Sequence, residues 1–226
     1  SYAWVSFGKE NVDSTYKVET GFTLMNDNGE ECSTVGLTCS DDVVTATLPL
    51  LLVKEIPLSV DLIEGAGATK ANTKIKIEPE SITLAGDYAI LTGMNKIVLD
   101  TIDLTDFAST TSETYTIPID NNMKNLTGAT EAKVTVEIVG LETRTYKVKN
   151  ISCTNVTEGY AADIISESID VVLRGTPQQL DQLKAESIRA VADLTDYKES
   201  TGQFMPNVKI IVDGFTDVGA IGQNTI

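Results

Sequence analysis

The chain of 226 residues contains no histidine and only three cysteines. Without histidine it lacks the side chain best suited to proton transfer near neutral pH, which is also the commonest imidazole ligand of metals. Cys32, Cys39 and Cys153 form neither a CxxC pair nor an even set, so a disulfide framework is not expected. A bridge between Cys32 and Cys39 and buried free thiols both remain open. We expect no catalytic residues, no metal site and no cofactor.

Basic residues are scarce, because 17 lysines and arginines stand against 33 acidic residues and give a formal net charge of −16. This charge repels phosphate backbones and anionic headgroups, so nucleic acid is not expected as a partner. Long apolar runs are missing too, and the best one, Leu48–Val53, is far too short to span a bilayer. No signal peptide opens the sequence. We expect a soluble fragment that does not insert into a membrane by itself.

Strand patterns dominate what is present. In Lys133–Ile138, branched apolar residues alternate with polar ones, which predicts one buried face and one wet face. Similar alternation or β-branched enrichment predicts further strands at Val43–Leu48, Ile56–Asp61, Thr73–Ile77, Ser81–Leu84, Tyr115–Ile119, Arg144–Val148, Ile169–Leu173, Ile188–Ala192 and Val208–Val212. The predicted fold class is mainly β.

The sequence also repeats itself. Leu84-Ala85-Gly86 precedes Asp103-Leu104-Thr105-Asp106-Phe107, and Leu173-Arg174-Gly175 precedes Asp193-Leu194-Thr195-Asp196-Tyr197. The offsets are 144 − 56 = 88 at the first strand, 175 − 86 = 89 at the glycine and 193 − 103 = 90 at the aspartate. Such a period marks tandem copies of one folding unit, here of 88 to 90 residues.

Each copy carries a short helix signal after its Leu-x-Gly. In the later copy Thr176 is a predicted N-cap, Pro177 fits the first helical position and Gln179 completes a capping box, with an end near Lys184 or Ala185. In the earlier copy Asp87 can cap, and Gly93 stops the helix early. Each repeat is therefore predicted to be a small twisted β domain with one short helix.

Alignment of the copies predicts the domain boundaries. Residues 1–50 match the C-terminal half of a repeat, 51–140 a complete repeat, and 141–226 a nearly complete repeat that lacks its last strand. In this alignment Val43–Leu48 corresponds to the closing strand at Val134–Val139. A half repeat exposes strand edges. We expect the chain to self-associate through its incomplete terminal repeats, or the orphan half to pack on its neighbour.

Several residues admit both a functional and a structural interpretation. Asp103 and Asp193 could be acid/base groups or cation ligands, but an aspartate at a strand end more often sets a turn. Gly86 and Gly175 could belong to phosphate loops, although a backbone bend explains them better. Asn28-Gly29 predicts a hairpin turn rather than a calcium loop.

The aromatic residues Trp4, Phe7 and Tyr16 gather near the orphan half repeat. They could form a partner-binding patch, but we expect them to be core residues of that half. We expect Arg174 and Lys198 to be solvated.

The combination of motifs resembles the YbbR repeat. In this sequence the motifs that carry the resemblance are Ile56–Val60, Glu78–Gly86 and Asp103-Leu104-Thr105 in one copy. In the next copy they are Ile169–Leu180, Ile188 and Ala192-Asp193-Leu194. The resemblance implies a mainly β repeat in proteins that stand outside the cytoplasmic membrane of Gram-positive bacteria, anchored by an N-terminal helix that this sequence lacks. It further implies a regulatory role toward the membrane diadenylate cyclase that makes cyclic di-AMP. No catalytic residues come with the resemblance.

Two other functions stay open. Tandem β domains also serve as structural or adhesive proteins of the bacterial surface. A hydrolase would need a nucleophile and a base, and no such pair is evident without histidine. The leading prediction is a non-enzymatic extracytoplasmic regulatory module, whose partner-binding residues the sequence leaves undetermined.

Overall fold

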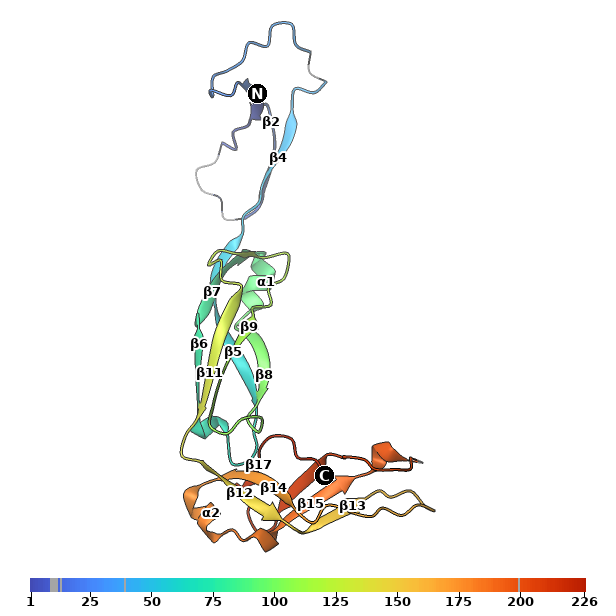
Figure 1. Cartoon of the computed structure of the whole chain (residues 1–226). Helices are drawn as coiled ribbons and strands as arrows, with labels where there is room; N and C mark the ends of the chain where they lie inside the picture. The colour runs from blue at the N-terminus through green and yellow to red at the C-terminus, as the bar shows by residue number, and fades with distance from the viewer. Residues whose placement is uncertain (9–11, 13, 39, 199) are drawn as a thin grey trace. The chain divides into compact units, whose positions relative to one another are not determined.

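A computed structural model describes residues 1–8, 12, 14–38, 40–198 and 200–226 (Figure 1). Strands dominate this part of the chain, and its two α-helices have six residues each. The prediction of a mainly β fold is confirmed. The described residues form two compact units. The first holds Ser1–Glu55, Thr83–Met94 and Asp120–Leu126, and the second holds Ile56–Ile82, Asn95–Ile119 and Thr127–Ile226.

The N-terminal part of the first unit consists of two antiparallel strand pairs. Strand β1 (Tyr2–Trp4) pairs with β3 (Thr23–Met25), and β2 (Tyr16–Thr20) pairs with β4 (Val44–Leu48). The alternation predicted for the last of these strands is observed, since Val44, Ala46 and Leu48 are half-buried while the threonines between them are exposed.

A tight turn follows β3. The side-chain oxygen of Asn26 accepts hydrogen bonds from the backbone N–H groups of Asn28 and Glu30, each at 2.9 Å. Gly29 has a φ of 78°, in the left-handed region that favours glycine. Met25 then forms an antiparallel bridge with Glu31. The predicted hairpin turn is confirmed.

The first unit also contains helix α1 (Tyr88–Gly93) and the short strand β10 (Lys124–Asn125), which pairs antiparallel with the end of β7 (Ser81–Gly86). The predicted cap is confirmed, because the Asp87 carboxylate accepts a hydrogen bond from the backbone N–H of Ala89 at 2.8 Å. At the other end of α1, the Lys54 ammonium donates to the carbonyls of Leu91 at 3.0 Å and Met94 at 2.6 Å. A cation here satisfies the free carbonyls and complements the helix dipole.

In the second unit, β11 (Glu131–Ile138) lies between β6 (Thr73–Glu78) and β9 (Thr110–Thr116) and pairs antiparallel with both (Figure 1). The predicted alternation of β11 is confirmed, because Val134, Val136 and Ile138 are buried and pack against Ile102 and Leu104. Beside this sheet, the second-unit part of β5 (Leu52–Ile63) runs parallel to β8 (Ile97–Asp103), and the short helical turn η1 (Lys70–Asn72) precedes β6.

The C-terminal part of the second unit has two three-stranded sheets, in the orders β12-β14-β17 and β13-β15-β16. The strands are β12 (Glu142–Val148), β13 (Ile151–Thr154), β14 (Ile169–Gly175), β15 (Ile188–Asp193), β16 (Val208–Val212) and β17 (Gly219–Ala220). The core between them is built around Val148, Val171, Leu173, Leu180 and Ile188, all at most 1% exposed.

Helix α2 (Pro177–Gln182) follows β14 and covers part of this core (Figure 1). The predicted capping box is confirmed, because the Thr176 hydroxyl accepts from the backbone N–H of Gln179 and the Gln179 side chain bonds back to Thr176. The helix ends slightly before the predicted Lys184. Two short helical turns, η2 (Ala185–Ser187) and η3 (Thr195–Tyr197), flank β15.

The same pairings recur in the two predicted copies. Strands β5 and β8 run parallel as β13 and β15 do, and Leu84 faces Asn125 as Leu173 faces Ala220. The offset is 173 − 84 = 89 on the first strand of that pair but 220 − 125 = 95 on its partner. The predicted period therefore holds as far as β15. The segment after β15, which carries β16 and the following turn, is longer than the corresponding segment of the earlier copy.

Strand β9 begins and ends earlier than the predicted Tyr115–Ile119. Pro118 cannot donate to a sheet ladder, so the pairing with β11 stops near Thr116. The start of β9, Thr110 to Thr114, is polar and lacks apolar alternation, so the pattern gave no strand signal there. The predictions also missed β1, β2, β8, β10, β13 and β17.

Candidate functional site

The repeated aspartates build turns. One carboxylate oxygen of Asp103 accepts from the backbone N–H and the hydroxyl of Thr105, at 2.8 and 2.7 Å. Asp193 does the same with Thr195, at 2.9 and 2.6 Å. The structural interpretation of both aspartates is confirmed. Over the described ranges, no three histidine, cysteine, aspartate or glutamate side chains are grouped as metal ligands.

Asp193 has a further partner. The Asn155 amide donates to its carboxylate at 2.8 Å. This hydrogen bond, together with those from Thr195, lowers the pKa of Asp193 to about 2. A carboxylate held ionised in this way cannot act as a general acid near neutral pH.

Gly86 and Gly175 are explained by close packing. A Cβ on Gly86 would lie 3.1 Å from Cγ of Met123, and one on Gly175 would lie 2.8 Å from Cγ2 of Val218. Neither glycine has a positive φ. The predicted backbone bend is therefore not what requires glycine. At Gly175 the Val218 side chain leaves no room for a Cβ, and at Gly86 the Met123 side chain would have to shift by a few tenths of an ångström to admit one.

Arg174 is fully buried, and the prediction that it is solvated is wrong. Its guanidinium donates to five backbone carbonyls, those of Gly65 (2.9 Å), Ala66 (3.0 Å), Leu104 (2.7 Å), Phe107 (2.7 Å) and Ala108 (3.3 Å). These carbonyls lie in two loops of the predicted repeat 51–140, while Arg174 is the second-last residue of β14 in the next. We call this set of hydrogen bonds the Arg174 joint.

Burial lowers the pKa of Arg174, and the nearby Asp103 carboxylate opposes that shift. The guanidinium stays protonated because its ordinary pKa is so high. Its five N–H donors in a planar fork suit a ring of carbonyl acceptors. The only sequence signal was an arginine placed directly after an apolar strand, where the earlier copy has Ala85. Lys198 is exposed, as predicted.

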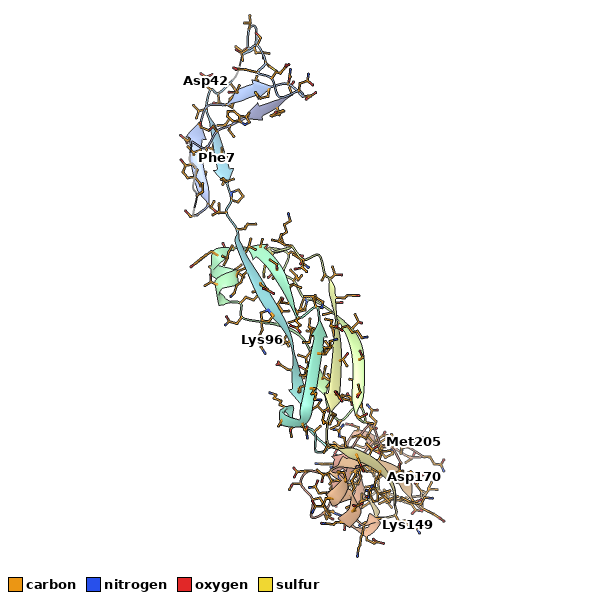
Figure 2. All side chains as sticks on the ribbon, turned by 90° about the vertical axis from the view of Figure 1, so that its left-hand side faces the viewer. Phe7, Asp42, Lys96, Lys149, Asp170 and Met205 are labelled. Carbon is orange, nitrogen blue, oxygen red and sulfur yellow. The ribbon has the colours of Figure 1, made fainter. Side chains whose placement is uncertain are left out.

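The N-terminal aromatic residues do not form a closed core. Trp4 is 53% exposed, so its prediction as a core residue is wrong. Phe7, labelled in Figure 2, and Tyr16 are half-buried with ring centroids 6.2 Å apart. Cys32 and Cys153 are free thiols, and Cys39, the other half of the possible bridge, lies outside the described residues.

The second unit contains a cavity of about 310 Å³ beside the ends of β13 and β15. We call it the apolar cavity. Its walls come mainly from residues within 155–166 and 200–206, and the other described lining residues are Cys153, Ala192, Leu194, Tyr197 and Ile226. Asp163 is the one charged side chain in the described lining. Large apolar side chains in its lining are exposed, among them Tyr160, Ile165 and Phe204.

Sequence analysis did not identify this cavity. Its walls have no regular strand or helix pattern beyond η3, so apolar residues such as Ile165 and Phe204 carried no periodic signal. The described helices are too short to cross a membrane.

No protein-family model matches the chain. The CdaA regulatory protein CdaR of Bacillus subtilis (strain 168) is 21% identical over 215 residues, which cover 92% of this chain and 42% of that relative. The chain thus spans less than half the length of the curated relative that it matches.

Two solved structures are also similar. A YbbR-like protein from Streptococcus pneumoniae TIGR4 is 15% identical, with a TM-score of 0.25 over 78% of this chain and 96% of that one. The solution structure of SuR18C from Streptococcus thermophilus is 15% identical, with a TM-score of 0.32 over 39% of this chain and 84% of that one. The chain is therefore similar to CdaR over nearly its whole length.

Proposed function

We propose that this chain is a non-enzymatic regulatory module that acts by protein contact on a membrane diadenylate cyclase and so controls cyclic di-AMP. The similarity to a protein named as the CdaA regulatory protein, over 92% of this chain, supports the proposal. The turn-forming role of both repeated aspartates agrees with it, since the residues that recur serve the fold.

The proposal includes the arrangement of the full protein. The module lies outside the cytoplasmic membrane of a Gram-positive bacterium and is anchored there by an N-terminal helix that is not part of this sequence. Residues 1–50 form half of a YbbR-like repeat, 51–140 a complete one and 141–226 a nearly complete one. The recurring strand pairings support this division.

The test uses the full-length protein in its own cell. Deleting its gene should change the cellular level of cyclic di-AMP, and a plasmid copy should restore it. The tagged protein should copurify with the cyclase from detergent-solubilised membranes. Unchanged cyclic di-AMP together with no copurification would contradict the proposal and favour a structural or adhesive role at the cell surface.

A further inference from the structure

Strand β9 lies at one edge of the sheet β6-β11-β9, because in the described part of the chain it pairs with β11 alone. Two backbone hydrogen bonds bracket this pairing. Ile117 donates to the Thr130 carbonyl at 2.9 Å, and Ile138 donates to the Ser109 carbonyl at 2.7 Å. Since hydrogen-bonded and non-bonded pairs alternate along an antiparallel ladder, the odd-numbered residues of β9 bond to β11. The even-numbered residues therefore point their N–H and C=O groups away from β11.

These outward positions form an open strand edge. All of them are exposed and uncharged, namely Thr110, Ser112, Thr114 and Thr116. Their side chains lie on the outer face of the sheet, the face opposite the buried Val134, because the hydroxyls of Ser112 and Thr135 meet there at 3.0 Å. A row of free N–H and C=O groups on an exposed strand is a template for pairing with another strand.

The opposite edge of the same sheet is protected against such pairing. Strand β6 carries Lys74, Lys76 and Glu78 at alternate positions, all of them exposed. Charged side chains on an edge strand discourage the addition of a further strand. Strand β9 carries a single charge, Glu113, whose carboxylate accepts from the Tyr115 hydroxyl at 3.0 Å. Strand addition is therefore favoured at β9 rather than at β6.

The phase of the outward positions selects the strand that can add. Two residues that exchange hydrogen bonds place their side chains on the same face, so the added strand must also combine outward backbone groups with outer-face side chains. Strand β9 of a second copy meets this condition through a two-fold axis perpendicular to the sheet. Strand β6 does not. Because Val139 donates to the Asn72 carbonyl at 2.8 Å, the outward residues of β6 are the odd-numbered ones, whose side chains lie on the inner face.

Glu113 selects the register of two paired β9 strands. An axis at Glu113 would give the longest overlap, but it would place two carboxylates directly opposite each other, which is destabilising. An axis at Thr114 instead sets Glu113 opposite Tyr115 of the partner subunit, a hydroxyl donor of the kind that already bonds this carboxylate within the chain. Thr110 would then face Pro118 of the partner subunit, which has no N–H, so the pairing ends there.

We propose that this protein forms a two-fold dimer in which β9 pairs antiparallel with β9 of a second copy, with Thr114 on the axis. The two sheets then join into one sheet in the order β6-β11-β9-β9-β11-β6. The paired segment, Ser112–Thr116, brings one charge per copy to the contact, so the net charge of −16 is largely kept away from it. The contact uses the same surface twice and therefore closes at the dimer. It is independent of the proposed function, because it needs no cyclase.

The first experiment measures mass. Light scattering over a concentration series should show a rise from 24.3 kDa to about twice that value and no further. Thr114→Pro removes the outward N–H at the axis and keeps the bonds to β11, since an edge strand tolerates proline where the N–H faces solvent. This variant should stay monomeric at concentrations where the parent is a dimer.

The matched control is Thr110→Pro, which removes an outward N–H of the same strand beyond the paired segment. It should dimerise like the parent. Hydrogen exchange of the β11 amides, which should be as slow in both proline variants as in the parent, shows that both variants fold.

The second experiment measures proximity and leaves the backbone of β9 unchanged. In a background with all three cysteines replaced by serine, Thr114→Cys should be joined into a covalent dimer by a thiol crosslinker that spans about 5 Å, the Cβ separation of directly opposite residues. Thr110→Cys should give no such product, because the two copies of this residue would lie about 27 Å apart along the paired strands.

Four results would each overturn the proposal. The first is a monomer at every concentration, and the second is a dimer that persists in folded Thr114→Pro. The third is a dimer that Thr110→Pro abolishes, since it would place the axis elsewhere on β9. The fourth is a dimer of Thr114→Cys that the short crosslinker does not join, which would show that the two chains meet at another surface.

Discussion

Arg174 shows how a single charged side chain can be buried without a carboxylate contact. Each of its five carbonyl acceptors carries a partial negative charge, and together they replace the water that the guanidinium loses. The same bonds satisfy backbone carbonyls in two loops that have few other partners in regular structure. Removing the side chain therefore takes a donor away from five carbonyls at once, among them that of the fully buried Leu104.

Arg174→Ala should lower the free energy of unfolding by about 3 to 5 kcal/mol, the range seen when one side of a buried charged network is removed. Denaturant titration followed by circular dichroism measures this loss. The matched control is Arg189→Ala, whose guanidinium pairs with Asp213 at 2.7 Å on an exposed surface and whose loss should lower the free energy of unfolding far less. Equal effects of the two substitutions would show that the Arg174 joint contributes little.

The pKa of Asp193 leads to a pH prediction. Its value of about 2 in the folded chain lies below the ordinary value near 4, so the hydrogen bonds from Asn155 and Thr195 stabilise the fold fully above about pH 4. This stabilisation is lost as the pH falls toward 2. Asn155→Gly removes the amide and suits the positive φ of 59° at this position.

In Asn155→Gly the pKa of Asp193, followed by NMR titration, should rise toward the ordinary value. Thermal melts of this variant should lose less stability between pH 4 and pH 2 than those of the parent. Asn95→Ala, an exposed asparagine on another loop, is the control. An unchanged Asp193 pKa in Asn155→Gly would refute the role assigned to the amide.

At the scale of elements, strands β11 and β4 differ in how many side chains they bury and in how many strands they pair with. Strand β11 buries four side chains and pairs on both edges, whereas β4 pairs with β2 alone in the described structure and buries none. Hydrogen exchange depends on such local stability. In dilute protein, amides of β4 should therefore exchange much faster than amides of β11.

Mass spectrometry of deuterium uptake in dilute protein measures the exchange rates of both strands. Strand β9, which also pairs with β11 but is mostly exposed, provides an internal control of edge-strand behaviour. Equal protection of β4 and β11 in dilute protein would contradict the difference in burial.

The elements that sequence predicted well are those with a local cause. The alternation of β11 and the Thr176 capping box each depend on residues that lie close together in the sequence, and both are observed. Strand β13, only four residues long, has no such local signal, because it forms through parallel pairing with β15 across nearly forty residues. Strand β9 was misplaced for a similar reason, since its polar start is a strand only because β11 lies beside it.

For the second unit as a whole, the Arg174 joint should fix how residues 51–140 and 141–226 of that unit are held together. Spin labels at Lys96→Cys and Lys149→Cys, two exposed positions labelled in Figure 2, report on this in a background free of other cysteines. The distance distribution between them should be narrow in the parent and broader in Arg174→Ala. Arg189→Ala should leave it unchanged, and an equally narrow distribution in Arg174→Ala would refute this role.

The candidate sites lay largely beyond sequence reasoning because they depend on long-range proximity. Arg174 contacts loops more than sixty residues earlier in the chain. The walls of the apolar cavity come from two segments that are separated by β14, α2 and β15. Composition did indicate the lack of a histidine-based catalytic site, since that rests on residue type alone.

The Arg174 joint also differs from an ordinary ion pair in how it responds to its surroundings. Backbone carbonyls do not titrate, and arginine keeps its proton at any physiological pH. Because the guanidinium is buried, dissolved salt screens it far less than it screens charges on the surface. The connection between these two parts of the second unit should therefore hold equally well in acidic or saline surroundings that would weaken a surface contact between lysine and glutamate.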